Sequence, residues 1–560
     1  MSDTAAPHRN PAPRLAASVI VLRDTDRGME VLMLRRAERA SDHHQSGAAV
    51  FPGGLLDGHD RGVHALARGP DDATASARLG VGSGGLDYWV AAIRECFEEA
   101  GLLFAVDASG RWAKLDAHDA AELRERRHRL HAGEADLTSL CREWGLTLAT
   151  DALHYHSHWL TPPGRLKRFD TRFFVAEAPP AQTAIADETE TAELMWLTPQ
   201  EALAPERGLK LLPVTRETLK SLATQRTVAD TIAAADARRE VPLMMPRLGT
   251  GAKGPRPVLP GEWAYAEISR LDPEGRGDVS IELMPGRPVR LSPRVVRVTA
   301  DNGNMMTGPG TNAYFVHEPG SGECALIDPG PDDDEHIRAL LVHAPGRITR
   351  ILVTHTHKDH SPAAQAIREA TGAPLYGRVA EHPEWQDATF RPDHVLAHGD
   401  EVALGPDCTL RAVHTPGHAS NHLCYLLGQE KLLFTGDHLM QGSTVVINPP
   451  DGDMQAYLDS LTGLLALDLE WLAPGHGFLM DRPHEVARRT VAHRLQREAK
   501  VVDALRAAGS ADLDALLAVV YQEVPKPLHA VAARSLRAHL LKLRADGRAR
   551  EDAGVWSLLS

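Results

Sequence analysis

The sequence predicts an α/β protein of several domains. Its 560 residues exceed what one hydrophobic core usually organises, so two to four domains are expected. Short apolar strands alternate with helical patterns in two separate stretches, and a Pro- and Gly-rich segment lies between these stretches. We expect a first domain over residues 1–225, a connector over 226–290, a second domain over 291–485 and a small C-terminal domain over 486–560.

The first stretch combines strands with one strongly patterned helix. The segments "LAASVIVLRD", "MEVLMLRR" and "GAAVFPGG" are typical of strands closed by turns, and "YWVAAIRECFEEAGLL" is typical of a helix. Residues 57–86 between them are rich in Gly, Asp, Arg and Ala, which indicates an insertion, and strands resume at "RFDTRFFVAEAP". These elements predict a mixed α/β domain.

The second stretch has the same alternation, and the tail differs from it. The strands "NAYFV", "CALIDPG", "RILVTH", "LRAVHTPGH" and "KLLFTGDH" alternate with helical patterns such as "SPAAQAIREATG". The last 65 or so residues contain three helical patterns and a short extended ending, "RAREDAGVWSLL". Three helices and a terminal ribbon predict a winged-helix domain.

Composition narrows the class of protein. A hydrophobic fraction of 43%, a charged fraction of 24% and a formal charge of -14 are ordinary for a soluble protein, and they argue against a nucleic-acid coat. Residues 486–560 are different, with 13 Lys or Arg against 8 Asp or Glu. Five scattered cysteines without a CxxC pair suit reduced thiols, and no run of about 18 apolar residues occurs. We expect a cytoplasmic protein without a membrane partner.

Four segments place a candidate metal ligand directly after an apolar strand and a turn. They are "RILVTHTHKDH", "LRAVHTPGH", "KLLFTGD" and "LEWLAPGH", and ligands at the same ends of neighbouring strands can converge. Imidazole and carboxylate groups suit zinc, and seven of them suffice for two metals if Asp437 is shared. A solvated histidine-rich loop is the alternative, but it does not explain the repeated pattern. The seven candidates are His355, His357, Asp359, His360, His418, Asp437 and His476.

The order HxHxDH, then His, Asp and His, resembles the metallo-β-lactamase fold family. The resemblance implies an αββα sandwich and hydrolysis by a hydroxide held between two Zn²⁺ or other divalent transition metals. It also implies a catalytic role for Asp359. The implied ligand sets are His355, His357 and His418 for one metal, Asp359, His360 and His476 for the other, and Asp437 as the bridge.

The segments "GPGTNAYFV", "SNHLCYLL" and "FTGDHLMQGSTVVINPPDGD", with the winged-helix tail, resemble the β-lactamase-like protein 2 group over about 290–560. That group includes single-strand endoribonucleases, which makes an RNA phosphodiester one expected substrate. An ester or a thioester is the other expectation for a hydrolase of this fold. RNA is a candidate partner of the basic tail, although a charged helix is more often a solvated face. Asn312 and His422 are candidate substrate contacts or structural residues, and Asp328 is expected to support the site from a turn.

A second candidate site consists of carboxylates on one helix. Glu95, Glu98 and Glu99 are spaced i, i+3, i+4, so they share one helical face. Like charges crowded in this way cost energy unless a metal cation or an Arg neutralises them. Mg²⁺ or Mn²⁺ would do so and would bring a bound diphosphate with it. Three glutamates alone would equally fit an acidic face turned to solvent.

The context of these glutamates resembles the Nudix family. "RECFEEAGL" fits the REuxEExGu half of the Nudix box, and Gly53 and Gly54 of "VFPGG" resemble its Gly-rich, substrate-binding turn. The resemblance implies an α/β/α sandwich, metal binding by Glu98 and Glu99, a ligand or base role for Glu95 and an orienting role for Arg94. Over 14–225 the chain resembles the branch acting on coenzyme A and acyl-coenzyme A diphosphates.

The Nudix box of this chain is interrupted. The standard box has 14 positions from its Gly to its Arg, whereas Gly54 and Arg94 are 40 apart. The upstream glutamate of the box is therefore missing, or it is replaced by another residue such as Asp57 or Asp87.

These observations predict a bifunctional hydrolase with small-molecule substrates: a nucleoside diphosphate derivative for the first domain, and an ester or thioester for the second. One alternative is a single active metallo-hydrolase whose Nudix domain senses a ligand or binds a partner. Another is a winged helix that recruits DNA.

Overall fold

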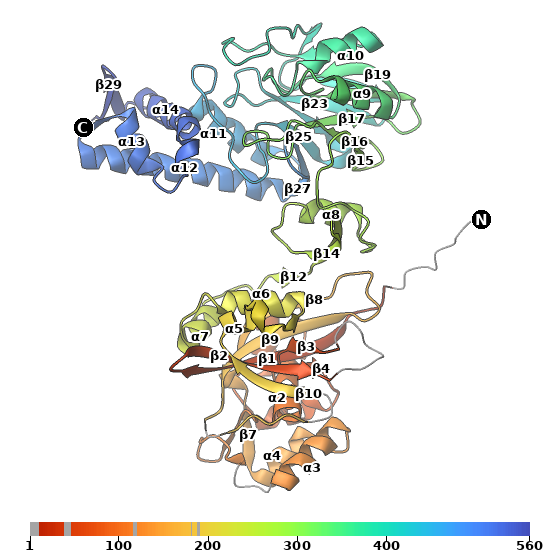
Figure 1. The fold of residues 1–560 in the computed structure, drawn as a ribbon, viewed down its shortest axis with the longest axis vertical. Coiled ribbons are helices and arrows are strands. Elements are labelled where there is room, and N and C mark those ends of the chain that lie inside the picture. The colour runs from red at the N-terminus through yellow and green to blue at the C-terminus, as the bar shows by residue number, and fades with distance from the viewer. Residues whose placement is uncertain (1–9, 38–45, 116–119, 181, 188–190, 560) are drawn as a thin grey trace. The chain divides into compact units, whose positions relative to one another are not determined.

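A computed structural model describes residues 10–37, 46–115, 120–180, 182–187 and 191–559. The chain forms two compact units, the first made of residues 1–248 with 274–276 and the second of 249–273 with 277–560 (Figure 1). The segment 226–290 that the sequence indicated as a connector is therefore divided between the two units.

The first unit is built on a nine-stranded sheet with the order β11-β3-β2-β1-β9-β8-β12, where β4 also pairs with β1 and β10 with β2. The central strand β1 runs parallel to β9 and antiparallel to β2. The strands are β1 (Arg14–Thr25), β2 (Gly28–Arg36), β3 (Ala48–Val50), β4 (Gly53–Leu55), β8 (His154–Leu160), β9 (Phe169–Glu177), β10 (Thr191–Leu197), β11 (Lys210–Leu211) and β12 (Leu243–Met244).

Helices lie on both sides of this sheet, with α2 on one side and α6 and α7 on the other (Figure 1). The apolar face of α2 is buried, and the Trp89 ring packs against Phe174 of β9 with centroids 4.5 Å apart. Gly101, in the left-handed conformation at φ 70°, ends α2. This α/β/α arrangement confirms the predicted sandwich. The helices are α2 (Gly85–Ala100), α5 (Pro199–Leu203), α6 (Pro213–Leu222) and α7 (Val228–Asp236).

Two segments beside α2 enlarge this unit. The first lies between β4 and α2, and the second joins α2 to β8 and carries the helices α3 and α4. A small sheet with the order β5-β7-β6 ties the two segments together. Their elements are the 3-10 helix η1 (Asp60–Leu66), β5 (Ala67–Arg68), α1 (Asp72–Leu79), β6 (Ala105–Asp107), α3 (Ala120–His131), α4 (Leu137–Trp144) and β7 (Leu146–Ala149).

The second unit begins with a small subdomain and continues into two facing sheets. The seven-stranded sheet has the order β15-β16-β17-β18-β19-β20-β21 and the six-stranded sheet β22-β23-β24-β25-β26-β27. Its strands are β13 (Arg247–Gly251), β14 (Gly254–Val258), β15 (Pro288–Arg290), β16 (Val295–Thr299), β17 (Asn312–Val316), β18 (Glu323–Ile327), β19 (Arg347–Leu352), β20 (Leu375–Gly377), β21 (His394–Val395), β22 (Glu401–Gly405), β23 (Cys408–His414), β24 (Leu423–Leu427), β25 (Leu432–Gly436), β26 (Trp471–Pro474) and β27 (Met480–Asp481).

The core of this unit lies between the two sheets, where Tyr314 and Ile327 from one sheet join Tyr425 and Phe434 from the other. The outer face of the first sheet packs on α9 and α10, and that of the second sheet on α11. This αββα sandwich is the predicted architecture. The helices are α8 (Tyr265–Leu271), α9 (Asp334–His343), α10 (Ala363–Thr371) and α11 (Met454–Gly463).

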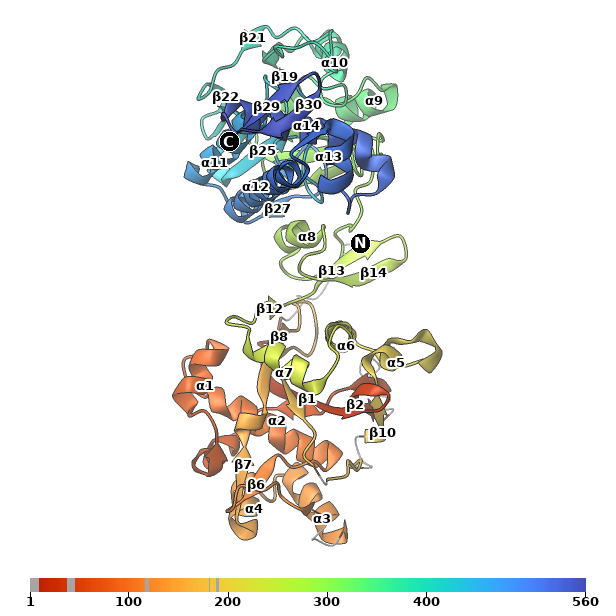
Figure 2. The ribbon, with the colours of Figure 1, turned by 90° about the vertical axis from the view of Figure 1, so that its left-hand side faces the viewer.

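The C-terminal part is the predicted winged helix. A separate core containing Leu505, Leu516, Leu540 and Trp556 joins three helices to a three-stranded sheet with the order β28-β30-β29 (Figure 2). The 26-residue helix α12 begins at Pro483, so one continuous helix crosses the expected boundary at 485. The elements are α12 (Pro483–Ala508), β28 (Ser510–Asp512), α13 (Leu513–Val520), α14 (His529–Ala545), β29 (Ala549–Asp552) and β30 (Val555–Leu558).

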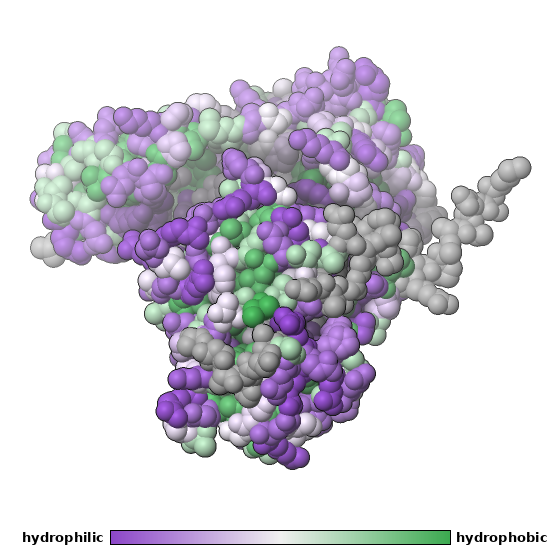
Figure 3. All heavy atoms as spheres, turned by 60° about the horizontal axis from the view of Figure 1, so that its bottom comes forward, coloured by the Kyte–Doolittle hydropathy of each residue, from purple (hydrophilic) through white to green (hydrophobic). Residues whose placement is uncertain are grey.

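The surface of the first unit that faces the viewer in Figure 3 is mainly hydrophilic, with a few hydrophobic residues showing between. No helix within the described ranges combines the length and apolar character needed to cross a membrane.

Candidate active sites

The seven histidines and aspartates singled out in the sequence come together in the second unit. Each follows the end of a strand: β19 leads to His355, β23 to His418, β25 to Asp437 and β26 to His476. Except for His357 and Asp359, these residues are less than 10% exposed. The ends of neighbouring strands thus converge on one point, as the repeated strand-turn pattern predicted.

The ligand atoms form two groups. In the first, Nδ1 of His357 lies 2.9 Å from Nε2 of His355 and 3.0 Å from Nε2 of His418. In the second, Oδ2 of Asp359 lies 3.4 Å from Nε2 of His360 and 3.3 Å from Nε2 of His476. Within each group every atom is within 4.8 Å of the others, as ligands of one ion must be.

Asp437 faces both groups. Its Oδ1 lies 3.2 Å from Nε2 of His476 and 3.4 Å from Nε2 of His360, and its Oδ2 lies 3.6 Å from Nε2 of His418. The two carboxylate oxygens therefore point to different triads. This is the arrangement required of a residue that bridges two cations.

The electrostatics of the cluster fit a cation-binding site. Burial lowers the pKa of His355 and His357, the latter to about 3, so these imidazoles are neutral and can offer a lone pair. Burial opposes ionisation of Asp437, but His476 and His360 hold its pKa well below the ordinary value. Buried Nε2 of His360 and Oδ1 of Asp437 have no hydrogen-bond partner among the described residues. The donor set of imidazoles and carboxylates is the one that zinc and similar divalent metals take.

Bonds behind the ligands orient them. Asp328, at φ 50°, accepts from the Thr354 amide and hydroxyl, both at 2.7 Å, and its Oδ2 lies 2.9 Å from Nδ1 of His360. Nδ1 of His418 lies 2.7 Å from the Val446 carbonyl oxygen. Each ring therefore turns its Nε2 toward the centre. Asp328 has the supporting place expected of it.

Asn312 and His422 both form hydrogen bonds with the loops that carry the candidate ligands. Both are completely buried. The Asn312 amide donates to the carbonyls of Pro474 and Gly477, which fixes the loop that carries His476. Nε2 of His422 accepts from the Asp437 amide at 3.2 Å. Of the two roles that the sequence left open, the structure favours support of the ligand loops over contact with substrate.

The carboxylate site of the first unit lies between β4 and α2. Arg94 is its hub: Nη1 donates to Oε1 of Glu95 at 2.7 Å and lies 3.4 Å from Oε1 of Glu98. Oε2 of Glu99 accepts from the Gly53 amide at 2.9 Å. A Cβ on Gly54 would stand 2.4 Å from the Glu95 carboxyl group, so a side chain at this position would displace that carboxyl group.

The residue that sequence reasoning missed is Asp60. Nε and Nη2 of Arg94 donate to its two oxygens at 2.8 and 3.2 Å. Asp57 and Asp87 were the expected replacements for the upstream glutamate, and neither pairs with Arg94; Asp87 instead pairs with Arg61 and His64. Asp60 stands six positions after Gly54, the offset of the glutamate in the standard box, so counting forward from Gly54 would have found it. The extra residues thus lie between Asp60 and Arg94, later than the predicted 57–86.

Burial and crowding raise the pKa of these carboxyls. Burial raises the pKa of Asp60 and Glu95 despite Arg94, and burial together with the Glu95 charge raises that of Glu98 to about 7. A cation would relieve this repulsion, and Mg²⁺ or Mn²⁺ prefers such oxygen ligands. The carboxylates line a cavity of about 290 Å³, and Arg36 and His131 also line it. His131, the last residue of α3, lies 3.6 Å from Oε2 of Glu98.

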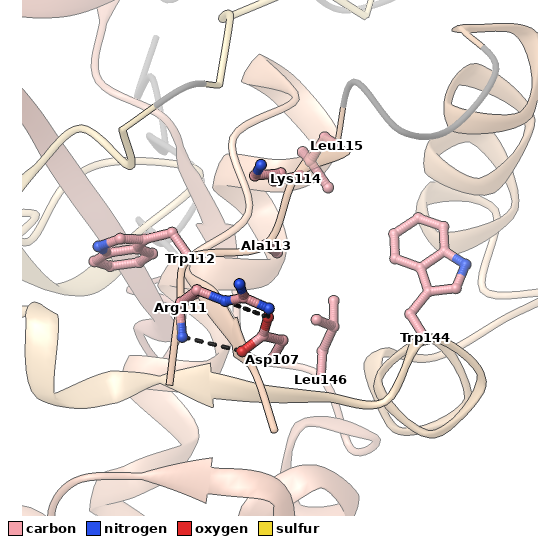
Figure 4. Close-up of a pocket in the computed structure, with 8 residues that line it drawn as sticks. All are labelled: Asp107, Arg111, Trp112, Ala113, Lys114, Leu115, Trp144 and Leu146. Atoms are coloured by element: carbon pink, nitrogen blue, oxygen red, sulfur yellow. Dashed lines mark hydrogen bonds and ion pairs between the residues drawn. The ribbon is translucent and has the colours of Figure 1, made fainter. Parts of the chain in front are cut away.

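A further cavity of about 270 Å³ lies beside β6 and β7 (Figure 4). Its one acidic side chain is already paired, because the Arg111 guanidinium lies 3.2 Å from Asp107 and the Arg111 amide donates to the same carboxylate. This cavity gathers no candidate ligands.

Comparisons with known proteins find three domain families in this chain. The family model of the metallo-beta-lactamase superfamily matches residues 306–476, that of the NUDT19 Nudix domain 71–207 and that of the beta-lactamase associated winged helix domain 513–556. The Nudix match begins after Gly54 and Asp60, beyond the first half of the box.

Two relatives resemble the second unit. A beta-lactamase-like protein 2 homolog from Drosophila melanogaster is 31% identical over 275 residues, covering 47% of this chain and 91% of the relative. An atrochrysone carboxyl ACP thioesterase from Aspergillus chevalieri is 32% identical over 275 residues, covering 46% and 83%.

Among solved structures, a metallo-beta-lactamase family protein from Thermus thermophilus is 20% identical with a TM-score of 0.41, covering 48% of this chain and 100% of its own. A Nudix hydrolase from Alicyclobacillus acidocaldarius is 25% identical with a TM-score of 0.34, covering 40% and 96%.

Together, the fold, the histidine site and the matches define a hydrolase that uses a divalent metal. The chain belongs to the metallo-β-lactamase superfamily, and it carries a Nudix domain and a winged helix in addition.

Proposed function

We propose that this chain is a bifunctional hydrolase. The second unit hydrolyses a thioester or ester with two Zn²⁺ ions, and the first hydrolyses a nucleoside diphosphate-linked compound, such as a coenzyme A derivative, with Mg²⁺ or Mn²⁺. The placement of Asp437 carries the first half of this proposal, because its two oxygens face separate triads of ligands.

Bound at these triads, two cations would lower the pKa of a water between them and stabilise the negative charge that develops on a carbonyl oxygen. The residues of the chain hold this arrangement. His355, His357 and His418 form one ligand set, and Asp359, His360 and His476 form the other. Gly475 lets the strand ends approach, because a Cβ there would stand 2.7 Å from His360 and 2.8 Å from Asp437.

The surroundings favour a thioester over RNA. A cavity of about 940 Å³ opens beside His418 and Asp437, and most of its lining is apolar. The basic residues of α14 are mainly engaged: Arg534 stacks on Trp385, Lys542 pairs with Glu498 and Asp546, and Arg544 pairs with Glu551. One relative is named a thioesterase that acts on an ACP-borne substrate.

For the first unit, the support is the complete set of charged groups around the cavity. Asp60 supplies the carboxylate that the interrupted box lacked, next to Arg94, Glu95, Glu98 and Glu99. A ligand-sensing module without catalysis was the alternative, and the presence of Asp60 removes its main support.

Two variants of the full-length, metal-loaded chain test the proposal. Asp437→Asn should lower thioester hydrolysis by at least about 100-fold and leave diphosphate hydrolysis unchanged, because it weakens the bridge between the two cations. Glu99→Gln should do the reverse. Full thioester activity in Asp437→Asn would contradict the first half of the proposal, and full diphosphate activity in Glu99→Gln the second.

A further inference from the structure

The cavity beside the metal centre has a basic wall. It holds about 940 Å³, and His418 and Asp437 border it on one side. The long helix α12, drawn in blue in Figure 1, contributes Arg489, His493 and Arg497 on another. These three residues are spaced i, i+4, i+8, so they lie along one face of the helix.

A short connection links this wall to the metal ligands. Arg494 of α12 is 3% exposed and donates from Nη2 to the carbonyl oxygen of Val445. The next carbonyl, that of Val446, lies 2.7 Å from Nδ1 of the ligand His418. Arg494 also borders the cavity, and its buried Nε has no hydrogen-bond partner in the described parts of the chain. The buried guanidinium of Arg494 is therefore linked to the candidate metal ligands by a short stretch of chain.

Two basic side chains on this wall have no partner among the residues that the structure describes. Arg497 is engaged, since it donates to Glu523 at 2.7 Å and stacks on the Tyr521 ring. In contrast, within the described ranges Arg489 and His493 make no side-chain hydrogen bond or ion pair, and both are exposed. Partial burial, together with the charges of Arg494 and Arg497, lowers the pKa of His493, so its neutral imidazole can donate an N–H to an anion.

The rest of the wall limits the kind of ligand. Trp263, Met306, Met440, Val446 and Val531 give it an apolar character. Arg482 is neutralised by Glu485 at 3.3 Å, so the basic groups do not form a continuous track. A polyanion such as RNA, which carries a phosphate at every nucleotide, would need such a track. A ligand with an apolar stretch and one anionic end fits better.

We propose that Arg489 and His493 bind a phosphate at the end of the thiol-bearing arm of the substrate, while the thioester carbonyl reaches the metal centre. This inference rests on the thioester hydrolysis proposed above. In that reaction the oxygen of water bonds to the carbonyl carbon, the C–S bond breaks, and the departing sulfur takes a proton from the water. The products are an acid and a thiol, and the phosphate is bound but unchanged. The substrate class is thus a thioester of a phosphorylated thiol arm.

Two acetyl thioesters that differ only in the phosphate test this: acetyl-pantetheine 4′-phosphate and acetyl-pantetheine. With the metal-loaded full chain we expect kcat/KM to be about 10- to 100-fold higher for the phosphorylated ester, as for a charge-assisted contact. In the double variant Arg489→Ala and His493→Ala, this ratio should fall to about one through a higher KM, with kcat and the phosphate-free ester unaffected.

Arg488→Ala is the matched control. It removes a positive charge from the adjacent exposed position of α12, which does not border the cavity, and it should keep the wild-type ratio. Equal kcat/KM for the two esters in the wild type, or a ratio that survives in the double variant, would overturn the phosphate site and leave thioester hydrolysis intact.

If neither ester is hydrolysed, the proposed thioesterase function is wrong. Titration calorimetry with unreactive pantetheine 4′-phosphate then still tests whether Arg489 and His493 bind the phosphate. Weaker binding by the double variant than by wild type and Arg488→Ala supports it, and equal affinity overturns it. If hydrolysis occurs, acetyl-coenzyme A and an acetylated carrier protein are compared as substrates, because each carries a phosphorylated thiol arm. The substrate whose KM rises in the double variant is the one that this wall binds.

Discussion

The Arg94 guanidinium donates to both oxygens of Asp60, from Nε at 2.8 Å and from Nη2 at 3.2 Å. The two side chains are 13% and 1% exposed, so this ion pair is shielded from water. Arg94 in turn contacts Glu95 and Glu98. The Asp60 carboxylate therefore orients the guanidinium that contacts the carboxylates of α2.

Asp60→Ala should destabilise the first unit by about 3–5 kcal/mol, because a buried guanidinium loses its main partner. Diphosphate hydrolysis should fall at least about tenfold, because Arg94 would no longer be held against Glu95. Urea unfolding and initial rates with a coenzyme A diphosphate substrate measure the two effects.

Asp57→Ala is the comparison for stability. Its side chain is 54% exposed, and its removal should cost less than about 0.5 kcal/mol. Asp60→Glu should retain activity, since it restores the residue of the standard box. Equal destabilisation by the two alanine variants would show that the Arg94–Asp60 ion pair does not stabilise the unit more than an exposed carboxylate does.

Asp328→Asn should weaken metal binding in the second unit about 10- to 100-fold. The carboxylate that accepts from Thr354 and pairs with Nδ1 of His360 would be lost, and His360 would no longer be held with Nε2 toward the centre. Competition with a chromophoric chelator measures the affinity. Asp333→Asn, at the N-terminus of α9, is a control that keeps the His360 contact, and unchanged affinity in Asp328→Asn would refute the orienting role.

Removing the metal should destabilise the second unit selectively. Two ions bound only by the folded state stabilise it by about 2.7 kcal/mol each at 100 times their Kd, so chelation should lower its Tm by about 5–10 °C. Differential scanning calorimetry with and without a transition-metal chelator measures this. The chelator should have less effect on Asp437→Asn, and an equal shift in both proteins would contradict Asp437 as the bridge.

His539 should make the winged helix sensitive to acid. It is completely buried, its ring nitrogens have no hydrogen-bond partner among the described residues, and burial with the charges of Arg494 and Arg497 lowers its pKa to about 3. The unfolded chain, with a histidine pKa of about 6.5, binds the proton more readily. Stability is therefore lost as the pH falls from about 6.5 toward 3, by about 2 kcal/mol at pH 5 for this group.

His539→Leu should remove that loss. Urea unfolding at pH 8 and pH 5 should show a smaller decrease for the variant than for the wild type, by about 2 kcal/mol. Parallel decreases in both proteins would exclude His539 as the source.

Local pattern was enough to predict much of this molecule. The seven candidate metal ligands follow their strands at short, fixed distances, and the three glutamates share one helical face, because both relations depend only on the periods of strand and helix. The order of helices and strands predicted the winged helix, and the resemblance of the motifs to two families implied the α/β/α and αββα sandwiches.

Tertiary structure decided what depends on long-range contact. Counting from Gly54 singles out Asp60, but the sequence alone could not show that its carboxylate pairs with Arg94 across the residues inserted between them, since a loop's length says little about where its ends lie. Nor could it bring Arg489 and His493 of α12 to the same cavity as His418 and Asp437, or show that Asn312 and His422 are buried. The sequence by itself determined which groups are candidate metal ligands, whereas packing of distant segments determined which partners orient those groups and which residues border the cavity beside them.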